Sequence, residues 1–221
     1  MSAARRAAAV LREPTAARHI PYAAQVSETV VKTFAGDYVQ AFRLAGVSFE
    51  SADDETLNNW HERLNVTWRN IASPNLALWT HVVRRRERAM PGAASGDGFA
   101  DRLARRYRER LAGETLMVNE LYLSIVYRPV AGSVSGLASR LYLRRAGANV
   151  AAELADALEA CAKIGQTLTA ALARYEPESL GLENRSGRTY SRLLEFLGEL
   201  INAEHQPVPL PRAPVNEMLA T

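Results

Sequence analysis

The chain has 221 residues, of which 48% are hydrophobic and 23% are charged, and its formal net charge is +3. This composition is typical of a globular domain and excludes a disordered tail. No apolar run approaches the roughly 20 residues that a membrane-spanning helix needs, and the single cysteine, Cys161, excludes an internal disulfide and fits a reducing compartment, so we expect a cytoplasmic protein.

The first part of the chain predicts a β-hairpin followed by a helix. Residues 1–18 are rich in Ala and Arg, and we expect a frayed or short helix there. Two β-rich runs flank Ala35-Gly36-Asp37, which is a hairpin signal. Acceptor side chains at 51–55 then precede apolar residues that recur every three or four positions up to Ile71, which predicts an amphipathic helix with Asp53, Asp54 and Glu55 at its capped start.

Two further strands with a helix between them follow. Residues 76–83 have the β-branched and aromatic character of a strand, and residues 116–127 form the longest such run. Between them, an apolar stripe beginning at Phe99 predicts a helix that Gly113 ends. The order β-β-α-β-α-β over residues 19–132 therefore predicts an α+β fold, a mainly antiparallel sheet with helices packed on one face. The strand order stays open, because parallel pairing across each helix is an alternative.

The second part of the chain predicts helices. After a linker at 133–149, apolar residues between 150 and 175 alternate in steps of three and four, and a second such pattern covers 189–203. We interpret residues 150–205 as an antiparallel helical hairpin. The Pro-rich tail at 206–221 predicts extended chain without an evident partner.

The sequence offers little for catalysis or for cofactor and metal binding. Only two of the 27 basic residues are lysines, Lys32 and Lys163, and neither lies in the Gly-Lys-Ser/Thr context of a phosphate-binding loop. The four histidines lack metal-binding spacing, so His81 is interpreted as a structural residue. Cys161 lies on an apolar seam, where a thiol is usually buried and inert. We therefore expect no catalytic residue, no metal and no cofactor in this chain.

The arginines are the remaining indication of a functional surface in the sequence. The basic run after residue 83 and the polar side of the helix that begins at Phe99 together predict an anion or partner surface. Its candidate residues are Arg84, Arg85, Arg86, Arg88, Arg102, Arg105 and Arg106. Such a surface suits phosphate, acidic lipid or an acidic protein, and the alternative is an ordinary solvated face. The modest net charge argues against extended binding to duplex DNA.

Four stretches together resemble a known family. They are residues 36–65, the segment RNIASPNLALWTHVVRRR at 69–86, the segment LAGETLMVNELYLSIVYRP at 111–129, and residues 196–211. In combination they are similar to the N-terminal region of the VirB/TrbE/CagE family, the conjugal transfer ATPases of bacterial type IV secretion systems. None of these stretches is a chemical motif, so the resemblance indicates a lineage without an active site.

The resemblance implies a role for the chain. Family members energise pilus assembly and the transfer of DNA or protein, and their nucleotide-binding domain follows the region matched here. ATP and Mg are therefore expected only in that missing domain. The chain itself is then expected to be a non-catalytic docking and assembly domain, cytoplasmic and peripheral to the inner membrane.

The resemblance also implies partners for the chain and a feature of its end. Its expected partners are inner-membrane channel subunits and the rest of its own ATPase, with homo-oligomers at full length. Nucleic-acid binding or attachment to an anionic membrane through the arginines is the alternative. If the chain ends within a domain, an unpaired sheet edge or an exposed apolar patch is expected near the C-terminal tail.

Overall fold

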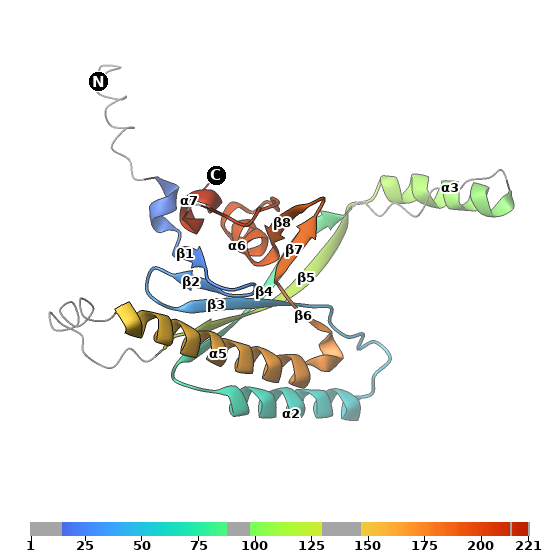
Figure 1. The fold of residues 1–221 in the computed structure, drawn as a ribbon. Coiled ribbons are helices and arrows are strands. Elements are labelled where there is room, and N and C mark those ends of the chain that lie inside the picture. The colour runs from blue at the N-terminus through green and yellow to red at the C-terminus, as the bar shows by residue number, and fades with distance from the viewer. Residues whose placement is uncertain (1–14, 88–97, 130–146, 213, 221) are drawn as a thin grey trace, which may run out of the picture.

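The computed structural model describes residues 15–87, 98–129, 147–212 and 214–220, and its centre is a six-stranded antiparallel sheet. The strand order is β1-β2-β3-β5-β4, and β6 also pairs with β3 (Figure 1). The strands are β1 (Tyr22–Gln25), β2 (Val31–Thr33), β3 (Tyr38–Leu44), β4 (Leu76–Glu87), β5 (Leu116–Tyr127) and β6 (Pro177–Ser179). β4 and β5 are much longer than the other strands, so they extend past β3 as a two-stranded arm.

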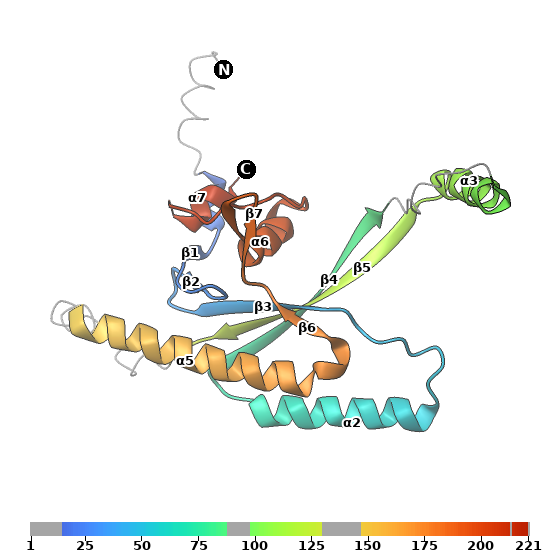
Figure 2. The ribbon, with the colours of Figure 1, turned by 45° about the vertical axis from the view of Figure 1, so that its right-hand side comes forward.

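Helices cover both faces of the sheet (Figures 1 and 2). On one face, named here the α5 face, lie α2 (Asp54–Ile71) and α5 (Gly147–Ala171), which ends in the short 3-10 helix η2 (Ala173–Tyr175). The opposite α6 face carries α6 (Arg192–Asn202), α7 (Val215–Leu219), the 3-10 helix η1 (Ala16–His19) and the hairpin of β7 (Leu182–Arg185) and β8 (Arg188–Ser191). The remaining helix, α3 (Phe99–Ala112), lies between β4 and β5 in the chain.

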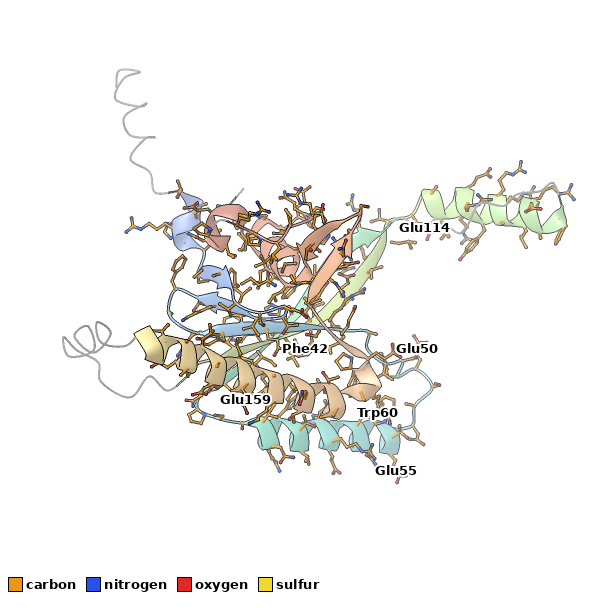
Figure 3. The ribbon with its side chains drawn as sticks, viewed as in Figure 1. Phe42, Glu50, Glu55, Trp60, Glu114 and Glu159 are labelled. Carbon is orange, nitrogen blue, oxygen red and sulfur yellow. The ribbon has the colours of Figure 1, made fainter. Side chains whose placement is uncertain are left out.

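The α5 face is closed by the apolar seam of α5 and by α2. Phe42, Leu123 and Leu168 are nearly fully buried there, and the side chain of Trp68 on α2 packs against the same cluster. Figure 3 shows Phe42 between the sheet and α5. Gly165 lets α5 approach closely, because a Cβ at this position would lie 3.2 Å from the Gln40 side chain. Burial of these aliphatic and aromatic side chains stabilises the body of the protein.

The α6 face is closed mainly by the last third of the chain. Leu193, Leu194 and Leu197 of α6 are buried against Tyr122 of β5, and Phe196 stacks on the Tyr122 ring with centroids 4.3 Å apart. The side chain of Ser191 caps α6 by accepting a hydrogen bond from the Leu194 N–H at 3.2 Å, which defines where this helix begins.

The predicted fold class and the early elements are confirmed. The fold is α+β with an antiparallel sheet, and β2 and β3 form the expected hairpin around Gly36, whose φ of 91° suits glycine. Asp53 caps α2 as predicted, accepting from the Thr56 N–H at 2.8 Å. The predicted helix and strand at 99–112 and 116–127 are found at those positions.

Three expectations about the architecture are wrong. The helices do not pack on one face, because α6 and α7 cover the face opposite α2 and α5 (Figure 2). Residues 150–205 do not form a helical hairpin: β6, β7 and β8 lie between α5 and α6. The tail does not lack a partner either, since Val215 and Leu219 of α7 are each only 1% exposed within the core. Beside the packed helix α7, the side chains of Leu200, Ile201 and Leu210 are 41%, 41% and 43% exposed.

The physical reason for these errors is the turn at Ser186-Gly187. Both residues have positive φ, 52° and 79°, which is the backbone geometry of a tight hairpin turn. The strands on either side have only four residues each, so their alternation is too short to stand out beside the helical pattern that follows. The chain passes from the α5 face to the α6 face through β6, and this hairpin follows on the α6 face (Figure 2). The predicted linker at 133–149 lies largely outside the described residues.

Candidate interaction surface

The seven predicted arginines do not form one surface. Successive residues of a strand point to opposite faces, so Arg84 and Arg86 lie on the α5 face of β4 whereas Arg85 lies on the α6 face. Arg102, Arg105 and Arg106 lie on α3. Arg88 lies outside the described residues.

Arg85 belongs to a structural network at the base of the arm. The buried carboxylate of Glu120 on β5 accepts hydrogen bonds from Arg85, from Arg43 at 3.0 Å and from the Tyr122 hydroxyl at 2.8 Å. Burial alone would raise the pKa of Glu120, but the hydrogen bonds from Tyr122 and Arg85 and the positive charges outweigh it and keep the pKa below its usual value. Burial and the hydrogen bond to Glu120 also raise the pKa of Tyr122 to about 12. The network fastens β3, β4 and β5 together where the arm leaves the body.

A polar cavity of about 230 Å³ lies beside this network, yet its charges are already balanced. Besides Arg43 and Arg85, its lining includes Arg185, which binds the buried carboxylate of Glu195 at 2.7 and 3.0 Å, and Arg192, which binds Glu178. Because these arginines donate to carboxylates of the same chain, the cavity is not suited to bind an anion.

Helix α3 has strong local reasons to form. Gly98 is its N-cap, Asp101 in the first turn and Arg110 in the last turn complement the helix dipole, and Gly113 ends it by donating its N–H to the Arg110 carbonyl at 3.3 Å. Figures 1 and 2 show α3 at the far end of the β4–β5 arm, away from the body. Figure 3 shows Glu114 at the junction of α3 with β5.

The apolar stripe of α3 has no partner among the described residues. Phe99, Leu103 and Tyr107 are 76%, 59% and 58% exposed, and no residue of the helix is buried. Their spacing of four places the three side chains along one side of the helix. A monomeric protein rarely leaves aligned aromatic and aliphatic side chains in water unless they bind something.

Arginines lie directly beside the stripe. Arg102, Arg106 and Arg110 follow the same spacing of four and so form a neighbouring row, and the helix holds five arginines against two acids. Arg110 is 4.0 Å from Glu114, and Arg108 donates to the Ala104 carbonyl at 3.3 Å. An apolar stripe next to a basic row is typical of helices that lie at the surface of an anionic membrane. We call this combination the α3 surface.

The histidine, cysteine and lysine residues considered for catalysis are buried or contact other residues of the chain. The Nε2 atom of His81 is 3.0 Å from the Ser124 hydroxyl, and burial lowers the pKa of this histidine. Cys161 is buried, which raises the pKa of its thiol to about 11. Lys163 pairs with Glu159 at 2.6 Å, and Lys32 lies over the Tyr38 ring. Among the described residues no group of His, Cys, Asp and Glu has a metal-binding arrangement.

Sequence reasoning identified the α3 stripe but not its exposure, and it missed Glu120. The periodicity that reveals an apolar stripe is the same for a buried helix and for an exposed one. Glu120 interrupts a β-rich run, and an acid within an apolar strand was the available signal for a buried ion pair.

Comparison with known proteins relates the chain to secretion ATPases. Residues 29–134 match the family described as "Type IV secretion system ATPase VirB4/TrbE, N-terminal domain". The chain is similar to the type IV secretion system protein virB4 of Brucella abortus, with 36% identity over 216 residues that cover 95% of this chain and 26% of the relative. It is also similar to PtlC of Bordetella pertussis, with 33% identity over 222 residues, 97% of this chain and 26% of the relative.

These relatives are much longer than the chain, which spans about a quarter of their length. Within the part of the chain that the structure describes, no helix combines the length and the apolar character needed to cross a bilayer.

Proposed function

The chain belongs to the VirB4/TrbE family of type IV secretion system ATPases, and from this premise we propose that it is a non-catalytic docking and assembly module that holds its ATPase at the inner membrane. The α3 surface supplies the attachment to anionic lipid. Inner-membrane channel subunits and the rest of the ATPase are the partners next to it.

One observation carries the proposal: a basic amphipathic helix stands at the end of an arm with its apolar stripe exposed. The body buries its main apolar clusters on both sheet faces, whereas no described residue covers the stripe of α3. On α3 the exposed side of Phe99, Leu103 and Tyr107 is bordered by Arg102 and Arg106. An anionic membrane, with charged headgroups above an apolar interior, satisfies both rows at once.

The expected affinity of the α3 surface for an anionic membrane is modest. Complete burial of a Leu or Phe side chain contributes roughly 1.5–3 kcal/mol, and each arginine near an anionic leaflet contributes about 1 kcal/mol. Since the stripe has only three strongly exposed side chains, it is expected to bind reversibly and in concert with protein contacts. Salt should weaken the arginine contribution and leave the apolar contribution nearly unchanged.

The surroundings of the two lysines support the absence of catalysis. Lys163 already pairs with Glu159, Lys32 lies over an aromatic ring, and neither follows a glycine-rich loop. A phosphate-binding site needs a lysine and backbone N–H groups directed at one point. We expect the purified chain to release no phosphate from Mg-ATP, and turnover that co-purifies with the chain through successive columns would contradict this part of the proposal.

The membrane role is tested by flotation with vesicles. The chain should float with vesicles that contain phosphatidylglycerol and remain at the bottom with vesicles of phosphatidylcholine. The double variant Phe99→Ala with Leu103→Ala and the double variant Arg102→Gln with Arg106→Gln should each lose most of the floating fraction. The matched control is Val66→Ala with Arg69→Gln on α2, where the valine is 54% exposed, and this variant should float like the wild type.

Other outcomes decide against the proposal. Equal flotation of all three variants would place lipid binding outside the α3 surface. Absence of flotation combined with salt-sensitive binding of single-stranded or duplex DNA, lost in Arg102→Gln with Arg106→Gln, would assign the α3 surface to nucleic acid instead.

A further inference from the structure

The outer edge of β4 is a long strand edge without a partner among the described residues. β4 runs for twelve residues and pairs only with β5, in unbroken register from Leu76 opposite Tyr127 to Glu87 opposite Leu116. An unpaired edge presents a row of backbone N–H and C=O groups that can pair with another strand.

Most devices that proteins use to protect such an edge are missing from β4. The strand contains no proline and no bulge, and between Leu76 and Val83 it carries no Asp, Glu, Lys or Arg. It is also about twice the usual strand length. The charged residues of the strand are confined to its distal end, from Arg84 onwards.

Large apolar side chains lie along the same strand and remain exposed. Trp79 on the α6 face and Val82 on the α5 face are 61% and 63% exposed. Because they lie on opposite faces of the strand at the border of the sheet, an added strand would cover both of them from the side. Backbone pairing and apolar contact would then act together.

We propose that this edge is a symmetric interface at which β4 pairs antiparallel with β4 of a second copy of the chain. The charge pattern of β4 favours this orientation of the second copy. Antiparallel pairing sets the Arg84–Arg86 end of each strand beside the uncharged Leu76–Val83 part of the other, so the arginine clusters lie apart, whereas parallel pairing would bring them together. The contact is isologous and closes at two subunits.

The pleat restricts the register. Residues that face each other across two paired strands point to the same face of the sheet. The two-fold axis must therefore set one residue of β4 opposite its own copy, and it cannot lie between two successive residues. An axis at Val82 sets Trp79 opposite Arg85 of the partner subunit, a pairing in which the methylene groups of the arginine can pack against the indole ring while its guanidinium stays bound to Glu120. The same axis sets Val82 opposite its own copy, which makes this position the most informative one to change.

The proposed interface lies on β4 and not on the α3 surface, so dimer formation can be tested independently of lipid attachment. Sedimentation velocity of the chain without lipid should show a dimer that dissociates on dilution. Val82→Lys places two positive charges opposite each other and should give a monomer, and its melting temperature should fall only by the loss of the dimer, because Val82 is solvent-exposed in the single chain.

Cysteine cross-linking tests the register. Val82→Cys should form a disulfide-linked dimer under mild oxidation, and the buried Cys161 does not compete. The matched control Val66→Cys, at an exposed position on α2, should stay monomeric in a denaturing gel. A wild-type chain that remains monomeric at its highest soluble concentration would overturn the proposal. A dimer that survives Val82→Lys would overturn it as well, because its interface would lie elsewhere.

Discussion

The body of the protein and its arm have the same kind of apolar periodicity but differ in what covers it. On α6, side chains spaced by three or four are buried against β5, and Leu193, Leu194 and Leu197 are at most 2% exposed. On α3, side chains spaced by four are more than half exposed. An apolar stripe therefore predicts a contact surface but does not say whether the partner belongs to the same chain.

The boundary between the two regions is the Glu120 network. On the body side of it, helices pack on both faces of the sheet, whereas beyond it β5 extends past the end of β3. A buried carboxylate bound by two arginines and a tyrosine fixes the direction of the arm. This difference gives three tests, from the largest expected effect to the smallest.

The largest effect is expected in the body. Leu197→Ala removes a side chain that is 2% exposed in the α6-face core, and the resulting cavity should lower the free energy of unfolding by about 2–5 kcal/mol. Urea denaturation followed by circular dichroism measures this change. A loss below about 1 kcal/mol would mean that α6 contributes as little to stability as α3 and would remove the distinction between body and arm.

A smaller effect is expected at the boundary. Glu120→Gln keeps the shape of the side chain but removes the charge that Arg43 and Arg85 bind, so we expect a loss of about 1–3 kcal/mol near neutral pH.

The pH dependence of this loss has a defined sign. Because the folded state lowers the pKa of Glu120 below its usual 4.5, its contribution is complete above that pH and disappears as the pH falls through the folded-state pKa. Wild type and Glu120→Gln should therefore converge in stability under acid, as urea titrations between pH 7 and pH 3 would measure. A gap that stays constant over this range would show that the charge of Glu120 is not the source of the effect.

The smallest effect is expected on the arm. Leu103→Ala removes a side chain that is 59% exposed, so the free energy of unfolding should change by less than about 0.5 kcal/mol. The same substitution should still reduce flotation with anionic vesicles. A destabilisation comparable to that of Leu197→Ala would show that the stripe packs within the chain, and the α3 surface would then not be available to lipid.

Local signals in the sequence predict many of the helices and turns, whereas the arrangement of these elements around the sheet is harder to predict. The Asp53 cap, the turn at Gly36 and the Gly113 end of α3 depend on neighbouring residues only, and each is found where the sequence placed it. The covering of both faces depends on the short hairpin at Ser186-Gly187 and on α7, whose five residues give too little periodicity to reveal a buried helix.

The candidate site was predicted only in part. The arginines of α3 were identified, but Arg85 was grouped with Arg84 and Arg86, although the alternation of a strand separates their side chains. No local pattern could show that Arg85 has a buried partner, because Glu120 is 35 residues away in the sequence. The exposure of Phe99 and Leu103 follows from the arm carrying α3 away from the body, which only the three-dimensional arrangement reveals.

Amide hydrogen exchange of the chain with and without phosphatidylglycerol vesicles tests the central claim most directly, since it reports on the body and the arm in one experiment. We predict that vesicles slow exchange within α3, at residues 99–112, and leave α5, α6 and β3 unchanged, because the lipid covers only the α3 surface. Protection that appears in the body while α3 exchanges as fast as before would contradict the account.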